Sequence, residues 1–509
     1  METVSENPTP RRRKWPYVLG AILLIILFIL LFLPSYLLKL WLNRTIDTEE
    51  LSDITEMRAG SARVSPLLTG FTIKDLTVVL KDREGFSVES IEAKNLKPGK
   101  VFKMLFGYGD QEEILNLLSG DATLVVRGLT KKNDSQREGF NVSLGTFSLG
   151  GLEFKGETID VSSISVRHLK VTDFFYELAG ELQFTLGSFA AFGLNGGTLN
   201  GLTVSSVNFI AQTGTKLAIG DFAISGFDFN NVFIPRNGPT IGTFFSFLDN
   251  TQSLDLAVLD ISLEGKEGIF INKFLVDTSQ TGEKRVILTD FRVNLLKIDP
   301  DIAYTPEGEV FFDSLGPILN LNAEFRGNPQ PDGYYQSLTK LNFPGALDLE
   351  LSLNTKNLRL DRLYTPQGLG AAFISASYGQ GHLTLSNRGV AERLYPSLSE
   401  VYFYGAPAKE GILNALDPVF SALDPAKVVN VAILQSEIDL FLSQPRTISI
   451  MWNPIEGFPR PILTELTKLG LSETQGTIDP ENFKYAIIAG LNLALVVNER
   501  APIFVTISE

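Results

Sequence analysis

The chain of 509 residues contains no cysteine and only two histidines. The lack of cysteine excludes disulfides, thiolate catalysis and cysteine-ligated zinc or iron–sulfur sites. His168 and His382 each lie in a strand-like stretch without HExxH spacing or a nearby acidic cluster. No GxSxG motif is present, and Gly379-Gln380-Gly381 leads into a strand, unlike a dinucleotide-binding loop. We therefore expect no catalytic residue, no cofactor and no metal, and a protein that is not an enzyme.

Positive charge is also scarce, since 44 Lys and Arg residues face 58 Asp and Glu residues, for a formal net charge of −14. The phosphate backbone of a nucleic acid repels a protein of net negative charge, and the sequence has no run of basic residues interleaved with aromatic ones. Nucleic acid is therefore not an expected partner. One acidic segment, Asp299-Pro300-Asp301 with Glu307 and Glu309, has two interpretations. It could bind Ca²⁺, but its spacing is not that of an EF-hand, which favours a solvated acidic loop.

One long apolar run, YVLGAILLIILFILLFL, extends from Tyr17 to Leu33 without a charged residue. At about 1.5 Å per residue, about 20 such residues span the hydrocarbon core of a bilayer. No small-x-small cleavage site follows, which favours an uncleaved anchor over a signal peptide. The sequence therefore predicts a transmembrane helix over residues 15–38, with these side chains in the membrane: Tyr17, Val18, Leu24, Ile26, Phe28 and Leu33.

Four basic residues, Arg11, Arg12, Arg13 and Lys14, directly precede the apolar run. Because basic residues stay on the cytoplasmic side, residues 1–14 form a predicted cytoplasmic tail and the body is translocated. A translocated body without cysteine suits the bacterial envelope better than a eukaryotic secreted protein. We expect a single-pass protein of the inner membrane with a periplasmic C-terminal body.

Alternation of apolar and polar residues with period two dominates the body, as in Leu347 to Asn354, where four leucines alternate with four polar residues. Such alternation is typical of strands with one buried face. Helical spacing is confined to a few segments. The expected strands include Phe71–Leu80, Phe86–Leu96, Gly120–Leu129, Leu254–Leu263, Val286–Leu296, Arg446–Trp452 and Leu491–Val497. The expected helices are one or two short ones within Gly99–Leu118, which Gly107-Tyr108-Gly109 interrupts, and Ala408–Leu423, Pro425–Phe441 and Pro459–Leu469. The predicted fold class is α+β and β-dominated, with an elongated, largely antiparallel sheet.

A short phrase recurs in the middle of the chain: an aliphatic residue, Gly, a small or acidic residue, then Phe. It occurs as Leu144-Gly145-Thr146-Phe147, Leu186-Gly187-Ser188-Phe189, Ile219-Gly220-Asp221-Phe222 and Ile241-Gly242-Thr243-Phe244. The phrase predicts degenerate strand repeats that stack into one sheet. The alternative is chance, because 44 Gly and 36 Phe are present. Six phenylalanines are candidates to line an apolar groove, or else fill an ordinary core: Phe227, Phe229, Phe233, Phe244, Phe245 and Phe247.

The start of the body, from Ala62-Arg63-Val64-Ser65-Pro66 through Val78 and then from Phe86 to Leu96, resembles the AsmA-like bacterial envelope proteins. The resemblance covers about a fifth of the chain. It implies an inner-membrane anchor, a long β-sheet groove in the periplasm, and a role in outer-membrane homeostasis or phospholipid movement. The remainder resembles uncharacterised anchored periplasmic proteins. The expected regions after the anchor are an AsmA-like strand–helix region at 39–140, a β-rich repeat body at 141–367 and a C-terminal α+β section at 368–509.

These patterns together favour a non-enzymatic protein of AsmA-like build in envelope lipid transport or outer-membrane homeostasis. Its expected partners are the membrane, phospholipid and other envelope proteins. A periplasmic scaffold or assembly factor is the alternative, and an anchored hydrolase comes third. An apolar groove would support lipid transport, whereas a closed core with a polar surface would support scaffolding.

Overall fold

The computed structural model describes residues 33–39, 54–80, 85–106, 119–132, 140–154, 164–178, 180–231, 246–248, 250–298, 300–357, 376–421, 423, 428–455 and 490–505. Within these ranges, no helix combines the length and the apolar character needed to cross a bilayer. The basic tail and the predicted anchor up to residue 32 lie outside them. Only the end of the predicted anchor, a helix over residues 33–39, is described.

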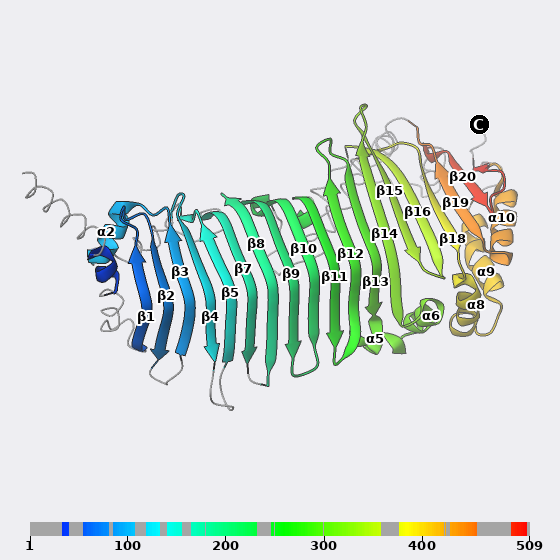
Figure 1. The fold of residues 1–509 in the computed structure, drawn as a ribbon. Coiled ribbons are helices and arrows are strands. Elements are labelled where there is room, and N and C mark those ends of the chain that lie inside the picture. Colours follow the sequence, from blue (N-terminus) through cyan, green and yellow to red (C-terminus); the bar gives the residue numbers. More distant parts are fainter. Residues whose placement is uncertain are drawn as a thin grey trace, which may run out of the picture. The chain divides into compact units, whose positions relative to one another are not determined.

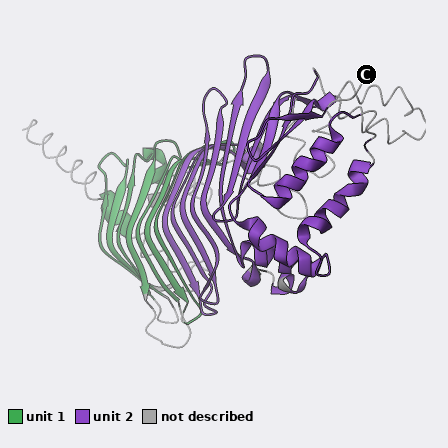
Figure 2. Ribbon diagram, turned by 90° about the vertical axis from the view of Figure 1, so that its right-hand side faces the viewer, with its two compact units in different colours: residues 1–197 green, residues 198–509 purple. Residues whose placement is uncertain are grey.

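The chain forms two compact units, Met1–Gly197 and Thr198–Glu509 (Figure 2). The division falls inside the predicted repeat body at 141–367 rather than at either of its ends. Within each unit, neighbouring strands pair in antiparallel orientation.

The sheet of the first unit consists of neighbouring strands in the order β1-β2-β3-β4-β5-β7-β8, with the short β6 beside β7. All of these pairings are antiparallel. Figure 1 shows these strands side by side. Apolar and polar residues alternate along them, which explains why one face packs against a core. The strands are β1 (Ile54–Val64), β2 (Phe71–Leu80), β3 (Gly85–Lys94), β4 (Thr123–Lys132), β5 (Phe140–Gly150), β6 (Glu153–Phe154), β7 (Ile164–Leu178) and β8 (Leu182–Asn195).

The sheet of the second unit runs β9 through β16 in sequence order and continues with β18, β19, β20 and β21, while β17 pairs with β16. The predicted C-terminal section thus continues the sheet, because β18 pairs directly with β16. The strands are β9 (Thr198–Ala211), β10 (Lys216–Asp228), β11 (Thr251–Leu263), β12 (Lys266–Thr278), β13 (Lys284–Asn294), β14 (Ile318–Pro329), β15 (Tyr334–Phe343), β16 (Leu347–Lys356), β17 (Ser377–Tyr378), β18 (Gly381–Asn387), β19 (Thr447–Trp452), β20 (Leu493–Val497) and β21 (Ile503–Val505). The predicted β-dominated, antiparallel character is confirmed.

Helices accompany both sheets. The described ones are the helix at 33–39 with α2 (Pro98–Phe106) in the first unit, and η4 (Phe229–Asn231), α5 (Leu295–Ile298), η5 (Pro300–Tyr304), α6 (Pro306–Leu315), α8 (Val390–Val401), α9 (Ala408–Ser421) and α10 (Val431–Ser443) in the second. Helices α8, α9 and α10 lie beside the last strands of the second unit (Figure 1). The predicted helix at Pro459–Leu469 lies outside the described residues.

Helix α10 begins later than its sequence pattern predicts. Asp424 and Pro425, the predicted start, lie outside the described residues. The described helix begins at Val431, because Asn430 takes the left-handed conformation with φ of 72° and Val428 forms a β-bridge, so no unbroken helix runs through residues 428–430. A left-handed residue interrupts the helical backbone, so the first turn forms only after it. Its end agrees with the prediction that Pro445 stops the helix.

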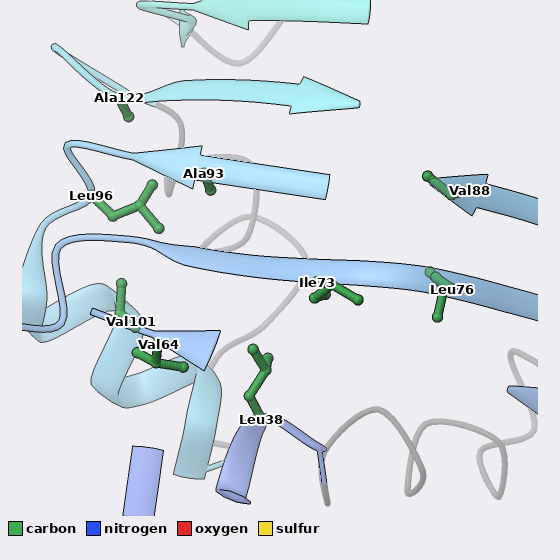
Figure 3. Close-up of a cluster of buried hydrophobic side chains, with 9 residues drawn as sticks. All are labelled: Leu38, Val64, Ile73, Leu76, Val88, Ala93, Leu96, Val101 and Ala122. Carbon is green, nitrogen blue, oxygen red and sulfur yellow. The ribbon is translucent and has the colours of Figure 1, made fainter. Parts of the chain in front are cut away.

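The core of the first unit lies where the two helices meet the first strands. Leu38 from the helix at 33–39 and Val101 from α2 are 1% and 0% exposed. They pack with Val64, Ile73 and Ala93, and Figure 3 shows them projecting from their helices toward the strands. The backbone N–H of Val64 also donates a hydrogen bond of 2.9 Å to Ser35 Oγ. The helix at 33–39, which includes the end of the predicted anchor, is therefore fixed to the sheet both by apolar packing and by this hydrogen bond.

The glycine of each described copy of the recurring phrase lies opposite a residue with a left-handed backbone conformation on a neighbouring strand. In the first unit, Gly145 of β5 lies opposite Asp173 of β7, and Gly187 of β8 faces Asp173 from the other side. In the second unit, Gly220 of β10 lies opposite Val258 of β11. Asp173 and Val258 take left-handed φ angles of 54° and 58°. The fourth phrase, around Gly242, lies outside the described residues.

The left-handed residue explains why its neighbour is glycine. A Cβ on Gly145 would lie 2.9 Å from the Cβ of Asp173, and a Cβ on Gly220 would lie 2.8 Å from the carbonyl oxygen of Ala257. Both separations are below van der Waals contact, so any side chain would displace the neighbouring strand. The kinked residues leave the strand pairing intact on either side, as β-bulges do in curved sheets.

Candidate functional site

One face of the first unit's sheet is apolar across all its long strands. The strand register aligns two cross-strand rows of side chains on this face. The opposite face carries polar rows, such as Lys74, Ser90, Arg127, Thr146, Thr172 and Ser188. The two apolar rows are Leu76, Val88, Leu129, Leu144, Phe174 and Leu186, and Ile73, Ile91, Val126, Phe147, Val171 and Phe189.

The apolar face is covered at its N-terminal side and partly open beyond it. Over β1 to β3, the helix at 33–39 and α2 bury Val64, Ile73 and Ala93 to 6%, 5% and 1% exposure. Over β7 and β8, the side chains of Phe174 and Leu186 are only half-buried. The whole of β8 from Leu182 to Ala191 is half-buried as well. A partly open apolar face on long strands is the most distinctive surface of this unit.

The second unit has an apolar face of the same kind. Its register aligns Val207, Ile219, Leu259, Ile271, Phe291 and Leu321, one from each of six neighbouring strands. All six side chains are half-buried. Leu248 packs with Leu254 and Val276 in a separate buried cluster at one end of these strands.

Of the phenylalanines predicted to line a groove, some are packed in a core and one is exposed. Phe227 is 5% exposed, and its ring centroid lies 4.9 Å from that of Phe247 and 4.6 Å from that of Phe229. Phe247 packs against the Leu248 cluster, whereas Phe229 is 42% exposed. Phe227 and Phe247 therefore fill a local core at a strand end. Phe233, Phe244 and Phe245 lie outside the described residues.

Sequence inspection missed a lysine on the apolar face of the first unit. Lys131 follows Leu129 by two residues on β4, so it points to the same face, and its side chain is 2% exposed. Its Nζ lies 3.5 Å from the ring centroid of Phe140 and 5.6 Å from that of Phe86. Cation–π contacts of this geometry stabilise a buried ammonium group. Strict counting of alternate residues along β4 would have placed Lys131 on this face.

Both histidines lie on the polar faces and contact neighbouring strands. His168 Nε2 lies 3.2 Å from Ser148 Oγ, and His382 Nε2 lies 3.1 Å from Glu350 Oε1. A hydrogen bond from Lys340, followed by one from His382, holds the pKa of Glu350 below its ordinary value. These contacts are those of cross-strand pairs. Among the described residues, no group of three or more His, Asp or Glu side chains is placed to hold a metal ion.

The acidic segment before α6 has a local structural role. Thr305 caps α6, accepting a hydrogen bond of 3.0 Å from the backbone N–H of Gly308. Glu307 and Glu309 then occupy the first turn. Acidic side chains there are stabilised by the positive end of the helix dipole, so helix capping accounts for their placement.

Comparison with known proteins adds no family: no family model and no curated protein matches the sequence. The class of protein is therefore defined by its fold and its surface alone. The chain is an antiparallel β-sheet protein whose sheets each keep one apolar face partly open, and the AsmA-like resemblance stays a prediction.

Proposed function

We propose that this protein is a membrane-anchored, non-enzymatic carrier of lipid in the bacterial envelope, which holds acyl chains on the apolar face of its sheets. One observation carries the proposal: beyond the buried Leu144, which is 9% exposed, the two apolar rows stay only partly buried at Phe147, Val171, Phe174, Leu186 and Phe189. Apolar surface left in contact with water costs free energy that a bound hydrocarbon chain recovers, at about 0.8 kcal/mol per buried methylene group. Long apolar patches on soluble surfaces commonly mark interaction sites.

The start of the first unit supports a route from the bilayer. The helix at 33–39 includes the end of the predicted anchor, and Leu38 and Ser35 hold it against β1 and its neighbours. In an anchored chain, the first strands therefore lie next to the membrane surface. By register, the apolar rows run from these strands, where the helix at 33–39 and α2 cover them, to β8, where they are partly open.

Photo-crosslinking in living cells tests the proposal on the full-length chain. We would incorporate p-benzoylphenylalanine in place of Phe184, which shares the apolar face, or of Thr185, its neighbour on the opposite face. The expected result is a lipid adduct, detected by mass spectrometry of the purified protein, at position 184 and none at position 185. The two sites differ by one residue, so expression and local environment are matched.

Equal labelling at both positions, or no lipid at either, would refute lipid binding on this face. A protein adduct at position 184 would favour the scaffold function instead. Because both variants are expressed and purified in the same way, the comparison does not depend on the total amount of lipid recovered.

A protein-binding scaffold is the second candidate, and exposed tyrosines of the second unit favour it. Tyr304 and Tyr404 are 87% and 96% exposed, and Tyr402, hydrogen-bonded to Glu307, is 42% exposed. Tyrosine is enriched at protein interfaces. The same crosslinker in place of Tyr404 should then capture an envelope protein, and its absence there would remove the support for this function.

A further inference from the structure

The exposed tyrosines of the second unit lie where two helices meet. Helix α6 packs against α8 (Figure 1). Ser397 of α8 donates a hydrogen bond of 2.9 Å to Asp313, near the end of α6. Tyr402, directly after α8, is hydrogen-bonded to Glu307, near the start of α6. The two helices are therefore antiparallel, and the beginning of α6 lies beside the end of α8.

This junction carries three exposed aromatic rings, Tyr304, Tyr402 and Tyr404, which we call the tyrosine surface. Tyr304 directly precedes Thr305, the N-cap of α6, while the other two follow the last turn of α8. All three side chains are exposed, and that of Tyr404 is almost fully so. Aromatic rings that no core covers are typical of surfaces that bind a partner.

The backbone at Tyr404 presents its ring rigidly. Tyr404 has a left-handed φ of 50°, which is unfavourable for a bulky residue and is usually adopted by glycine after a helix. The backbone N–H of Gly405 donates a hydrogen bond of 2.8 Å to the carbonyl oxygen of Ser399, which closes this turn. The ring of Phe403 lies so close to Gly411 of α9 that no Cβ fits there. The protein thus keeps an exposed ring where stability alone favours glycine, as binding sites do.

The charge around the tyrosine surface is negative. From Pro300 to Leu315 the chain has four carboxylates and no Lys or Arg, and from Leu394 to Ala408 its one charged residue is Glu400. The neighbouring basic residues bind other groups: Lys297 pairs with Glu264, Arg393 donates to the carbonyl oxygen of Gly345, and Lys409 pairs with Asp439. The dipoles at the start of α6 and the end of α8 have opposite signs and offset each other, so the carboxylates set the charge. A complementary partner is therefore cationic.

Tyrosine rings beside carboxylates match one cation in particular. A guanidinium stacks flat on an aromatic ring and also forms paired hydrogen bonds with a carboxylate, whereas an ammonium acts as a point charge. Glu307 is exposed, and its carboxylate can accept further hydrogen bonds beside the one that joins it to Tyr402. Because the rings come from two separate chain segments, an extended peptide suits the surface better than a single side chain does.

We propose that the tyrosine surface docks an extended, arginine-bearing segment of a partner protein, with guanidinium groups stacked on the rings and paired with Glu307 and its acidic neighbours. The inference does not depend on the proposed lipid function, and it names the chemistry of the protein partner that the exposed tyrosines favour. The tyrosine surface belongs to helices and turns, whereas the apolar rows belong to strands. The two proposals can therefore fail separately.

Fluorescence anisotropy of labelled peptides measures binding to the full-length chain in micelles of an uncharged detergent. The probes are three peptides in which proline alternates with arginine, lysine or glutamine, since proline keeps each of them extended. Tyr404→Gly removes the ring at a position whose backbone suits glycine, so thermal unfolding should show an unchanged or higher Tm. Glu307→Gln removes one charge. The matched controls are Tyr36→Ala and Glu181→Gln, at exposed positions of the first unit.

The arginine peptide should bind most tightly and the glutamine peptide least. Tyr404→Gly and Glu307→Gln should each weaken the arginine peptide about three- to fivefold, as loss of an exposed cation–π contact or ion pair does. Tyr404→Phe, which keeps the ring, and both controls should change it less than about twofold.

No binding of the arginine peptide, or unchanged binding by both Tyr404→Gly and Glu307→Gln, would overturn the docking site. Equal affinity for the lysine and arginine peptides would overturn the assignment to arginine, and equal affinity for the glutamine peptide would overturn the need for a cation. Absence of lipid adducts at position 184 in the crosslinking experiment would instead overturn the proposed lipid function and leave the docking site standing.

Discussion

The glycine at the centre of the recurring phrase makes a prediction that can be tested by a mutant cycle. In Gly145→Ala, the new Cβ would lie 2.7 Å from Asp173 Oδ2 and 2.9 Å from Asp173 Cβ. The carboxylate can rotate away, but the Cβ is fixed to the backbone, so the strands must shift. Overpacking of this kind costs about 1–3 kcal/mol.

Replacing Asp173 by glycine should remove the loss of stability that Gly145→Ala causes. Asp173 has φ of 54°, a conformation that costs an L-residue about 1–2 kcal/mol and glycine almost nothing. Asp173→Gly alone should be close to neutral, because this relief is offset by the loss of about 0.5–1 kcal/mol that glycine brings to a strand. In the double variant no Cβ opposes the alanine introduced at position 145, so the stability of the protein should return to within about 1 kcal/mol of the original chain.

Thermal unfolding of the full-length protein in detergent measures the cycle. For a unit of 197 residues, about 1 kcal/mol shifts Tm by about 2–4 °C. Gly99→Ala is the control, since a Cβ there meets nothing within 4 Å. The reasoning fails if the double variant is destabilised by the sum of the two single changes, because no coupling between the residues would then exist.

Two further predictions concern the cores and the ion pairs. Leu38→Ala should destabilise the first unit by about 2–5 kcal/mol, because the side chain is 1% exposed in the cluster that holds the helix to the sheet. Tyr36→Ala, at a position 62% exposed on the same helix, should have little effect in the same thermal scan. Glu350→Gln tests how ionisation of this carboxyl group contributes to the free energy of unfolding. Because folding lowers the pKa of Glu350, the stabilisation is present above the ordinary pKa of 4.5 and is lost as pH falls through the pKa of the folded state. The difference in urea midpoint between the original chain and the variant should therefore shrink below pH 4.5, and a difference that grows there would contradict the assignment.

The sequence determined the β-dominated fold because its evidence is local. Period-two alternation from Leu347 to Asn354 predicted β16, and the same reasoning predicted Phe71–Leu80 with the bounds that the structure shows. Each side chain in a strand points opposite to the next, so the pattern can be recognised without knowledge of any partner strand. The start of α10 escaped this reasoning, because the left-handed turn at Asn430 is not signalled by hydrophobic spacing.

Tertiary structure alone decided what these elements do together. The pattern at Gly145 could suggest a repeat, but only strand register brought that glycine opposite the kinked Asp173. Register likewise placed Lys131 against Phe140, and the packing of α6 on α8 brought Glu307 to Tyr402. The physical reason is that such contacts join residues distant in the chain. A sequence specifies which face is apolar, whereas the packing of separate elements decides where that face is covered and where it stays open.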